Sequence, residues 1–129
     1  MIIRAHEGEF VNLIAQSKNG SGKTGAFTIG STLRVDPKIN KPQVIAICHI
    51  RELSSQIADV YKKVCKFSDI TVSDYTATNN ANAHILVTTL GQLSKALSAR
   101  KAAIDLSELR VVVIDEVDYF FTNNAQNKQ

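Results

Sequence analysis

The segment of this chain best suited to chemistry is a glycine-rich loop: Ser17, Lys18, Asn19, Gly20, Ser21, Gly22, Lys23 and Thr24. The backbone N–H groups of such a loop can turn inward and surround phosphate oxygens. Gly20 and Gly22 permit the backbone angles and the close approach that this requires. Lys23 would bring a positive charge to the β- and γ-phosphates, and the Thr24 hydroxyl is a hard oxygen ligand for Mg²⁺. The loop therefore predicts a nucleotide site.

The surroundings of the loop favour this prediction over a simpler one. An apolar run at residues 11–15 (VNLIA) precedes the loop and an amphipathic stretch follows it, which is the strand-loop-helix context of a phosphate loop. A helix beginning near Thr24 would add its positive dipole end. The simpler alternative is a flexible Gly/Ser turn that happens to contain a lysine. The widest form of the motif begins with glycine where this chain has Ser17, which is compatible with the loop if that position needs no positive φ.

A second candidate is the pair of carboxylates Asp115 and Glu116, which follows the apolar run 110–114 (RVVVI). In P-loop ATPases an acid at the end of a buried strand holds Mg²⁺, usually through water. An adjacent carboxylate can orient or deprotonate the attacking water. We therefore predict Asp115 as the metal residue and Glu116 as the catalytic base, with Lys23 completing the catalytic set. Taken alone, the pair would be better explained as solvated acids that begin a loop, and Asp118 as a helix cap.

The apolar pattern along the chain predicts the elements that would hold these residues. Strands are expected at residues 11–15, 43–48, 70–76, 84–88 and 110–114. Helices are expected at residues 24–33, 51–65 and 92–99. This alternation predicts a three-layer α/β domain with a mostly parallel central sheet. The carboxyl ends of its strands would meet at one edge, where ligands bind.

Two of these elements carry a sharper expectation. The helix at residues 24–33 is expected to turn Ala26, Phe27, Ile29 and Leu33 toward the core, because they fall on one side of it. The continuous apolar run at 110–114 is typical of a central parallel strand that is covered on both faces.

The composition is that of an ordinary globular domain. The chain has 129 residues, of which 44% are hydrophobic and 21% charged, enough for one domain with a sizeable core. No apolar stretch approaches the ~18 residues of a membrane span, so no membrane partner is expected. Cys48 and Cys65 have no metal-ligand spacing and are expected to be reduced, buried thiols of a cytosolic or nuclear protein. The net charge of +3 fits an anionic partner without requiring one.

Taken together, the motifs resemble those of the DEAD-box ATP-dependent RNA helicases. Residues 115–118 (DEVD) resemble the family's D-E-A-D motif, and residues 15–24 resemble its phosphate loop. Residues 51–56 (RELSSQ) are similar to the R-E-L-A-x-Q half of motif Ia, and residues 89–91 (TLG) to the T-P-G of motif Ib. The motifs keep the family's order and spacing over residues 12–121. The resemblance implies a single, partial domain over residues 1–129: the N-terminal RecA-like P-loop domain of such a helicase, truncated.

The start of the phosphate loop looks like that of one branch of the family. Residues 12–17 (NLIAQS), followed by two polar residues before the glycines, resemble the mRNA-export helicases, as do residues 40–43 (NKPQ). Those helicases act at the cytoplasmic face of the nuclear pore. The resemblance therefore implies a cytoplasmic or nuclear location and a role in mRNA transport.

The resemblance also implies a mechanism. Two RecA-like domains would close on ATP and single-stranded RNA, bend the RNA, part short duplexes, and reopen after hydrolysis to ADP. Arg51, Thr89 and Gly91 would contact the RNA sugar–phosphate backbone, which gives affinity without sequence reading. Asp118 would couple the ATP state to RNA through the family's motif III. Protein regulators are further possible partners.

Several positions depart from the family pattern, mostly where RNA would bind. His49 and Ile50 stand where motif Ia usually begins Pro-Thr, and Ile50 cannot donate a hydroxyl to a phosphate. Leu90 replaces the motif Ib proline, and Lys95 stands where an aspartate is common. Val117 replaces the alanine of the D-E-A-D motif, a modest increase in volume. ATP binding is therefore better supported than RNA binding.

The family's adenine-binding Q motif would precede Met1, and motif III and the second RecA-like domain would follow Gln129. The second domain supplies arginines that stabilise the transferring phosphoryl group and are worth ~10³-fold or more in rate. We therefore expect the 129-residue chain alone to bind ATP weakly and to hydrolyse it negligibly. The oligomeric state stays open, since an incomplete sheet could expose an edge that favours association.

Two other functions stay open at this point. One is a P-loop ATPase with no nucleic-acid partner. The other is a non-catalytic descendant that serves as a binding or adaptor module, which the departures at His49, Ile50 and Leu90 favour. The retained nucleotide residues argue against it, because a dead enzyme has no chemical need for them.

Other polar features have simpler explanations. The histidines are too scattered to share a metal: His6, His49 and His84. A basic run is better explained as a solvated helix face than as an RNA contact: Lys62, Lys63 and Lys66. Tyr75 and the pair Phe120 and Phe121 are better explained by packing than by stacking on bases.

Overall fold

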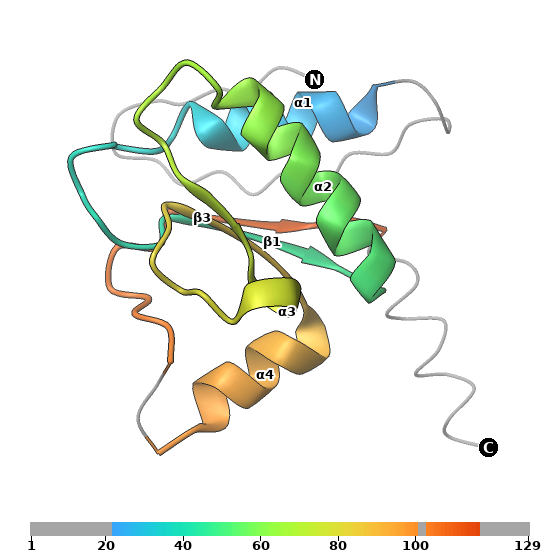
Figure 1. Cartoon of the computed structure of the whole chain (residues 1–129), viewed down its shortest axis with the longest axis vertical. Helices are drawn as coiled ribbons and strands as arrows, with labels where there is room; N and C mark the ends of the chain where they lie inside the picture. The colour runs from blue at the N-terminus through green and yellow to red at the C-terminus, as the bar shows by residue number, and fades with distance from the viewer. Residues whose placement is uncertain (1–21, 101–102, 117–129) are drawn as a thin grey trace.

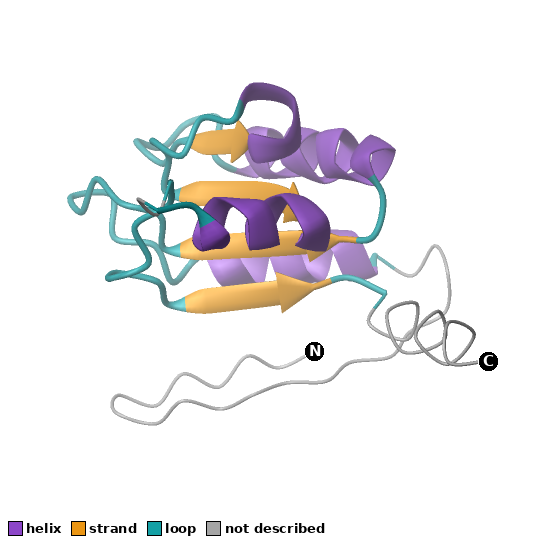
Figure 2. Cartoon of the chain, turned by 90° about the horizontal axis from the view of Figure 1, so that it is seen from below, coloured by secondary structure: helices purple, strands orange, loops and turns teal. Residues whose placement is uncertain are grey.

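In the computed structural model, residues 22–100 and 103–116 are described, and they form a parallel sheet with helices on both faces. The helices are α1 (Lys23–Thr32), α2 (Arg51–Val64), α3 (Tyr75–Thr78) and α4 (Leu90–Ser98). The strands are β1 (Val44–Cys48), β2 (Val72–Asp74), β3 (Ile85–Thr89) and β4 (Val111–Ile114). The strands run parallel in the order β2-β3-β1-β4, and their arrows all point the same way in Figure 2. The predicted α/β class with a parallel sheet is confirmed.

The core lies on both sides of β1, where all five residues are buried. Val44, Ala46 and Cys48 face α1 and α2, and Ile45 and Ile47 face the opposite side. Figure 1 shows α1 and α2 together on one face of the sheet and α3 and α4 on the other. A strand buried on both faces needs a continuous apolar run rather than an alternating one, which is the pattern that the sequence has there.

The helix α2 is held by a regular apolar stripe that includes Ile57, Ala58 and Tyr61. The Tyr61 ring is fully buried, and its hydroxyl is 2.7 Å from the Ser31 hydroxyl of α1. Burial raises the pKa of Tyr61 to about 12, so this phenol stays neutral and joins the two helices by a hydrogen bond. Within the described ranges, no helix is both long enough and apolar enough to cross a membrane.

The predicted apolar face of α1 is wrong in part. Phe27 packs against the core as expected, but Ile29 is 53% exposed and Leu33 is 78% exposed. Thr28 and Ser31 are buried in their place. Their hydroxyls donate to carbonyls one turn earlier, at 2.9 and 2.7 Å, so the burial leaves no hydroxyl donor unsatisfied. Counting apolar residues missed this, because a satisfied threonine or serine can occupy a core position.

The predicted strand at residues 70–76 is wrong at its end, since β2 stops at Asp74 and α3 begins at Tyr75. The Thr78 hydroxyl donates to the Asp74 carbonyl at 3.0 Å, and the Thr76 hydroxyl donates to the Asp74 carboxylate at 2.6 Å. Such local hydrogen bonds compete with those of a strand ladder. Asn79 then ends the helical turn in a left-handed conformation, with φ 52°.

The strand β4 is confirmed, but its predicted cover is found on one face only of the described structure. Val111 and Val113 pack toward the α1 and α2 side. Val112 is 51% exposed and Ile114 is 47% exposed on the other side. Among the described residues β4 pairs with β1 alone, so it forms one edge of the described sheet.

Candidate active site

The N-terminus of α1 lies at the carboxyl edge of the sheet and begins with a glycine in a strained geometry. Gly22, the N-cap, has φ 82° and ψ 19°, a left-handed conformation that side chains rarely adopt. Within residues 22–100 and 103–116, no side chain caps this end of α1. The first N–H groups of a helix have no partner within the helix, so they can bind an anion, and the helix dipole favours one. This end of α1 therefore suits a phosphate group.

Lys23 and Asp115 meet at this edge. The Lys23 ammonium lies 3.2 Å from Asp115 Oδ1, and the Asp115 side chain is only 13% exposed. The Asp115 N–H donates to the Ile47 carbonyl at 3.0 Å, which fixes the end of β4 beside β1. A cation at the first turn of a helix opposes the helix dipole, so Asp115 offsets an unfavourable charge there. The two predicted residues are 92 positions apart in the chain and share one ion pair in the fold.

Thr24 follows Lys23 in the first turn of α1 and is partly buried there. Its hydroxyl and the Asp115 carboxylate are both hard oxygen donors, the kind that Mg²⁺ binds. Asp115 Oδ1 is buried and, although close to Lys23, accepts no aligned hydrogen bond from the described residues. A buried carboxylate oxygen with spare acceptor capacity fits a site for a cation with its bound water.

Glu116 leaves the end of β4 in an unusual backbone conformation. Its φ is 52°, a conformation that costs a non-glycine residue about 1–3 kcal/mol and is enriched at active sites. Its side chain is 48% exposed, so it can reach a water molecule in front of the edge. Glu116 Oε2 lies 3.4 Å from His49 Nδ1, which makes an ion pair when the imidazole is protonated.

His49 is the residue at this site that sequence reasoning missed. It was grouped with scattered histidines, but it follows β1 directly and meets Glu116 across the sheet edge. A signal was present, because His49 interrupts the expected Pro-Thr start of motif Ia immediately after a buried strand.

The three predicted RNA residues also lie at the carboxyl edge, where α2 and α4 begin. Arg51 is the exposed first residue of α2. Thr89 is the N-cap of α4, and its hydroxyl accepts a hydrogen bond from the Gln92 N–H at 3.4 Å. Gly91 is exposed, and a Cβ at this position would meet no atom within 4 Å. Thr89 therefore has a structural role of its own, whereas Gly91 has none that the described packing requires.

A buried carboxylate braces this part of the edge. Asp74 accepts hydrogen bonds from the hydroxyls of Ser54 (2.9 Å), Ser55 (2.7 Å) and Thr76 (2.6 Å). Burial opposes the ionisation of Asp74, but these hydrogen bonds outweigh it and hold its pKa below the ordinary value. The network ties the end of β2 to the first turn of α2, next to Arg51.

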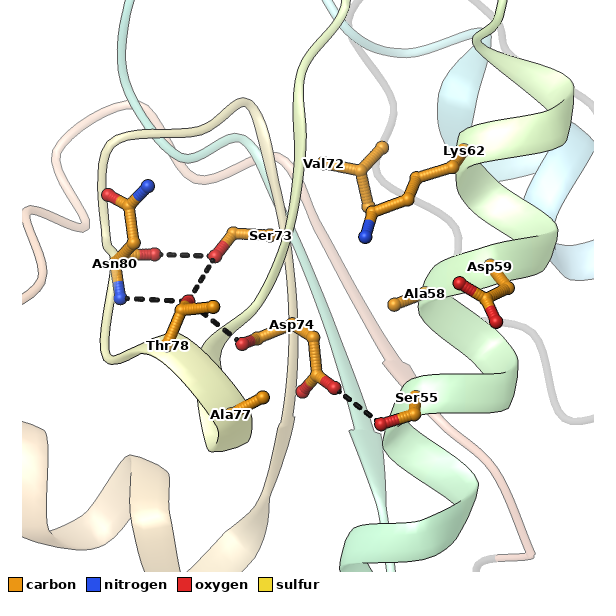
Figure 3. A pocket seen from close by; sticks show the side chains of 10 residues that line it. All are labelled: Ser55, Ala58, Asp59, Lys62, Val72, Ser73, Asp74, Ala77, Thr78 and Asn80. Carbon is orange, nitrogen blue, oxygen red and sulfur yellow. Dashed lines mark hydrogen bonds between the residues drawn. The ribbon is translucent and has the colours of Figure 1, made fainter.

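A hollow of about 280 Å³ lies behind this network, between α2, β2 and α3. Figure 3 shows Ser55 and Asp74 joined on one side of it, with Lys62 beside Val72. Among the described residues, none of those predicted to bind nucleotide or metal lines this hollow. The Lys23–Asp115 pair is therefore recognised by its chemistry rather than by this hollow.

The cysteines behave as expected. Cys48 and Cys65 are free and buried. Burial, with the nearby Asp74 charge, raises the pKa of Cys48 to about 11, and its thiol donates to the Thr88 carbonyl at 3.3 Å. Cys48 is therefore a protonated core residue rather than a nucleophile.

Part of the predicted site falls outside the described residues. This applies to five loop residues and the coupling acid: Ser17, Lys18, Asn19, Gly20, Ser21 and Asp118. Their roles stay predictions. The described remainder of the loop, from Gly22 to Thr24, stands where a phosphate loop would join its helix.

Comparison with known proteins assigns the family. The sequence profile described as DEAD/DEAH box helicase matches residues 1–129. The chain belongs to this family. The resemblance drawn from the motifs is confirmed.

Individual relatives agree. The chain is 39% identical over 125 residues to DEAD-box ATP-dependent RNA helicase 38 of Arabidopsis thaliana, covering 88% of this chain and 25% of that protein. A solved structure of S. cerevisiae Dbp5 L327V bound to Gle1 H337R and IP6 matches with TM-score 0.77 and 34% identity, over 86% of this chain and 29% of that one. S. cerevisiae Dbp5 bound to RNA and ADP BeF3 matches with TM-score 0.60 and 25% identity, over 89% and 39%. The chain thus spans about a quarter of the length of its curated relative.

Proposed function

We propose that this chain is the ATP-binding domain of an RNA-dependent ATPase that remodels RNA or RNA–protein complexes. The observation that carries the proposal is the ion pair of 3.2 Å between Lys23 and Asp115. It supports the proposal because a cation suited to phosphates and a carboxylate suited to a metal lie together beside the N-terminus of α1. Family membership supplies the type of reaction.

In this proposal, the loop residues 17–24 bind the phosphates of ATP or ADP, and Lys23 leaves Asp115 to pair with them. Thr24 and Asp115 hold Mg²⁺, Asp115 through water, because they present hard oxygen donors beside the phosphates. The metal neutralises charge on the phosphate oxygens. Exchange of partners costs Lys23 little, since its ion pair with Asp115 is replaced by one with phosphate.

Glu116 acts as the base that orients the attacking water and accepts its proton. Its strained backbone and its half-exposed side chain support this role. His49 holds the Glu116 carboxylate in the absence of ATP, at 3.4 Å. His49 would thereby link the end of β1, where RNA contacts begin, to the position of the base.

RNA binds along the same edge in this proposal, through backbone contacts from Arg51, Thr89 and Gly91. The related yeast Dbp5 is bound to RNA and ADP BeF3 in one solved structure, so a fold of this kind accepts both ligands. Contacts of this type read no sequence. Asp118 would couple the two sites.

The wider role follows from the relatives. We propose that a second RecA-like domain, outside this chain, supplies arginines for hydrolysis, since the chain spans about a quarter of its curated relative. The likeness to Dbp5 favours mRNA export, at or near the nuclear pore, and its complex with Gle1 and IP6 favours control by regulatory proteins. The 129-residue chain alone should then turn over ATP negligibly, and turnover at the rate of a full-length helicase would contradict this.

The first test is a fluorescence titration of ATP and ADP with Mg²⁺ against the chain and its Lys23→Ala variant. We expect weak binding by the chain and a loss of about tenfold or more in the variant, since a charge-assisted contact is worth about 1.5–3 kcal/mol. Lys95→Ala, an exposed lysine of α4, is the matched control and should bind unchanged. Binding that survives in Lys23→Ala would reject the phosphate site, and no binding by a folded chain would limit the proposal to a longer protein.

A second candidate function is a non-catalytic binding module. The observation in its favour is that Ile50 and Leu90 are 40% and 51% exposed at the edge where RNA contacts are expected. An apolar edge suits a protein partner better than a phosphate backbone. Partner binding that needs no ATP and is unaffected by Lys23→Ala would favour this candidate.

A further inference from the structure

Three apolar side chains stand exposed where the C-terminal ends of α1 and α2 meet. They are Leu33, which is 78% exposed, Val64, which is 40% exposed, and Phe67, which is 96% exposed. We refer to these residues as the α1–α2 apolar patch. Figure 1 shows both helices ending on the same side of the molecule, with the chain after α2 passing above the end of α1.

The frame beneath the patch is fixed by buried contacts. The Ser31 and Tyr61 hydroxyls are 2.7 Å apart, and Thr32 Oγ1 lies 4.0 Å from Cys65 Sγ. Leu33 follows Thr32 directly and Val64 precedes Cys65 directly, so both flank the same junction. Val64 is the last residue of α2, Leu33 follows the last residue of α1, and Phe67 lies three residues beyond α2, so the patch stands at the ends of two packed helices.

Each apolar residue of the patch has a cation beside it in the chain. Arg34 follows Leu33, Lys63 precedes Val64, and Lys66 precedes Phe67. The Lys66 ammonium also lies 5.4 Å from the centre of the Phe67 ring. Within the described parts of the chain, none of these cations is in a salt bridge. Lys62 is not part of this group of cations, since it lines the hollow beside Val72 (Figure 3).

We propose that the α1–α2 apolar patch binds a short acidic segment of another protein that carries large apolar side chains. The apolar residues would enter between Leu33, Val64 and Phe67, and the carboxylates would pair with the flanking cations. This is the charge pattern of an amphipathic helix that docks on an apolar surface. Exposed apolar groups rimmed by charge commonly mark such interfaces.

The position of the patch separates it from the proposed ATP and RNA edge. Arg51 begins α2 and Val64 ends it, so the patch lies about 20 Å from the RNA contacts at 1.5 Å per helical residue. RNA is less suited to it, because aliphatic Leu33 and Val64 offer no stacking surface for bases. A second copy of the chain is also less suited, because like charges would face each other.

The test begins with the 129-residue chain as bait for a displayed library of random peptides of about 16 residues, long enough for an amphipathic helix. Selected peptides are then labelled and titrated by fluorescence anisotropy against the chain and its variants. We expect them to be rich in Asp, Glu, Leu and Phe. Phe67→Ser and the double variant Lys63→Glu/Lys66→Glu should each weaken binding about tenfold or more, the loss typical of an interface hot spot.

Matched controls keep the result interpretable. Leu97→Ser, another half-exposed leucine, and Lys95→Glu both lie on α4 and should change binding less than about twofold. Phe67 is almost fully exposed, so its variant should keep the circular dichroism melting temperature of the parent within about 2 °C. Lys23→Ala should leave peptide binding unchanged, which separates this proposal from the nucleotide site.

Several results would overturn the proposal. One is a selection that yields no enriched peptides, and another is a set of peptides that bind Phe67→Ser as tightly as the parent. Labelled oligouridine bound by the chain and lost in Phe67→Ser, with no peptide binding, would assign the patch to RNA. Sedimentation of the chain as a dimer that Phe67→Ser dissociates would assign it to self-association.

Discussion

At the carboxyl edge of the sheet, the residues proposed for nucleotide (the nucleotide half) and those proposed for RNA (the RNA half) keep different amounts of their family's chemistry. In the nucleotide half, Lys23 and Asp115 are in contact at 3.2 Å and both match the family pattern. In the RNA half, Ile50 and Leu90 expose apolar surface where the family has polar or rigid residues. In the proposed function, one ligand connects all the groups of the nucleotide half, so the loss of any one of them should affect the others. RNA contacts are numerous and individually weak, so single losses are better tolerated.

The largest effect is expected from Asp115→Ala. Removing a carboxylate that holds a metal through water should weaken Mg²⁺-dependent ATP binding about 10–100-fold. Titration of ATP with Mg²⁺ and with a chelator measures this, and the chelator should remove the difference between variant and parent.

Asp105→Ala is the matched control for that experiment. Asp105 pairs with Lys41 at 3.2 Å on the surface, so its loss breaks an ion pair outside the site. Equal ATP affinity of both variants would reject Asp115 as a metal residue and leave the nucleotide half without its carboxylate.

A smaller effect is expected from Gly22→Ala. The φ of 82° at Gly22 would cost an alanine about 1–2 kcal/mol, which corresponds to a loss of about 5- to 30-fold in phosphate affinity or an equal loss of stability. Nucleotide titration measures the loss of affinity and urea unfolding measures the loss of stability, and together they give the total cost of the substitution.

Gly91→Ala makes the same glycine-to-alanine change in the RNA half as Gly22→Ala makes in the nucleotide half. Gly91 has no positive φ and has free space for a Cβ, and alanine favours a helix by up to about 1 kcal/mol over glycine. The Gly91→Ala variant should be as stable as the parent or more stable, and it should bind ATP with the same affinity. A loss of stability as large as that of Gly22→Ala would contradict the contrast.

Asp74→Asn should destabilise the chain by about 1–2 kcal/mol at neutral pH, because three hydroxyls lose a charged acceptor. The pKa of Asp74 is lowered in the folded chain. Its contribution is therefore fully present above the unfolded pKa near 3.9 and is lost as pH falls through the lower folded pKa. Urea unfolding should show a difference between variant and parent at pH 7 that narrows at acid pH.

Asp59→Asn, an exposed acid of α2, should show no such difference at either pH. If Asp74→Asn unfolds like the parent at pH 7, the network does not brace the RNA half of the edge.

The smallest effect is expected from restoring family residues in the RNA half. Ile50→Thr adds a hydroxyl for a phosphate, and Leu90→Pro is compatible with the first position of α4, where proline is tolerated. A neutral hydrogen bond is worth about 0.5–1.5 kcal/mol, so the double variant should bind oligouridine about 2–10-fold more tightly at low salt. Unchanged affinity in anisotropy titrations would mean that the edge has been adapted to another partner.

Sequence patterns predicted the elements better than they predicted faces. The helix at 51–65 was correct within one residue because α2 has a regular apolar stripe. The predicted face of α1 was partly wrong, since the hydroxyls of Thr28 and Ser31 donate to carbonyls of their own helix and these residues can therefore be buried. The predicted end of β2 was wrong because Asp74 accepts local hydrogen bonds that end the strand. Periodicity records hydrophobicity, and it does not record which polar groups find partners.

By itself, the sequence determined the family, the parallel α/β class and the candidate nucleotide residues. These depend on local order: glycines beside a lysine, and acids at the end of an apolar run. Only the tertiary structure brought Lys23 to Asp115 and His49 to Glu116, and left Leu33 and Phe67 exposed. The physical reason is that these relations join residues of different elements. Their distances and exposure depend on how helices pack on the sheet, which no single stretch of sequence specifies.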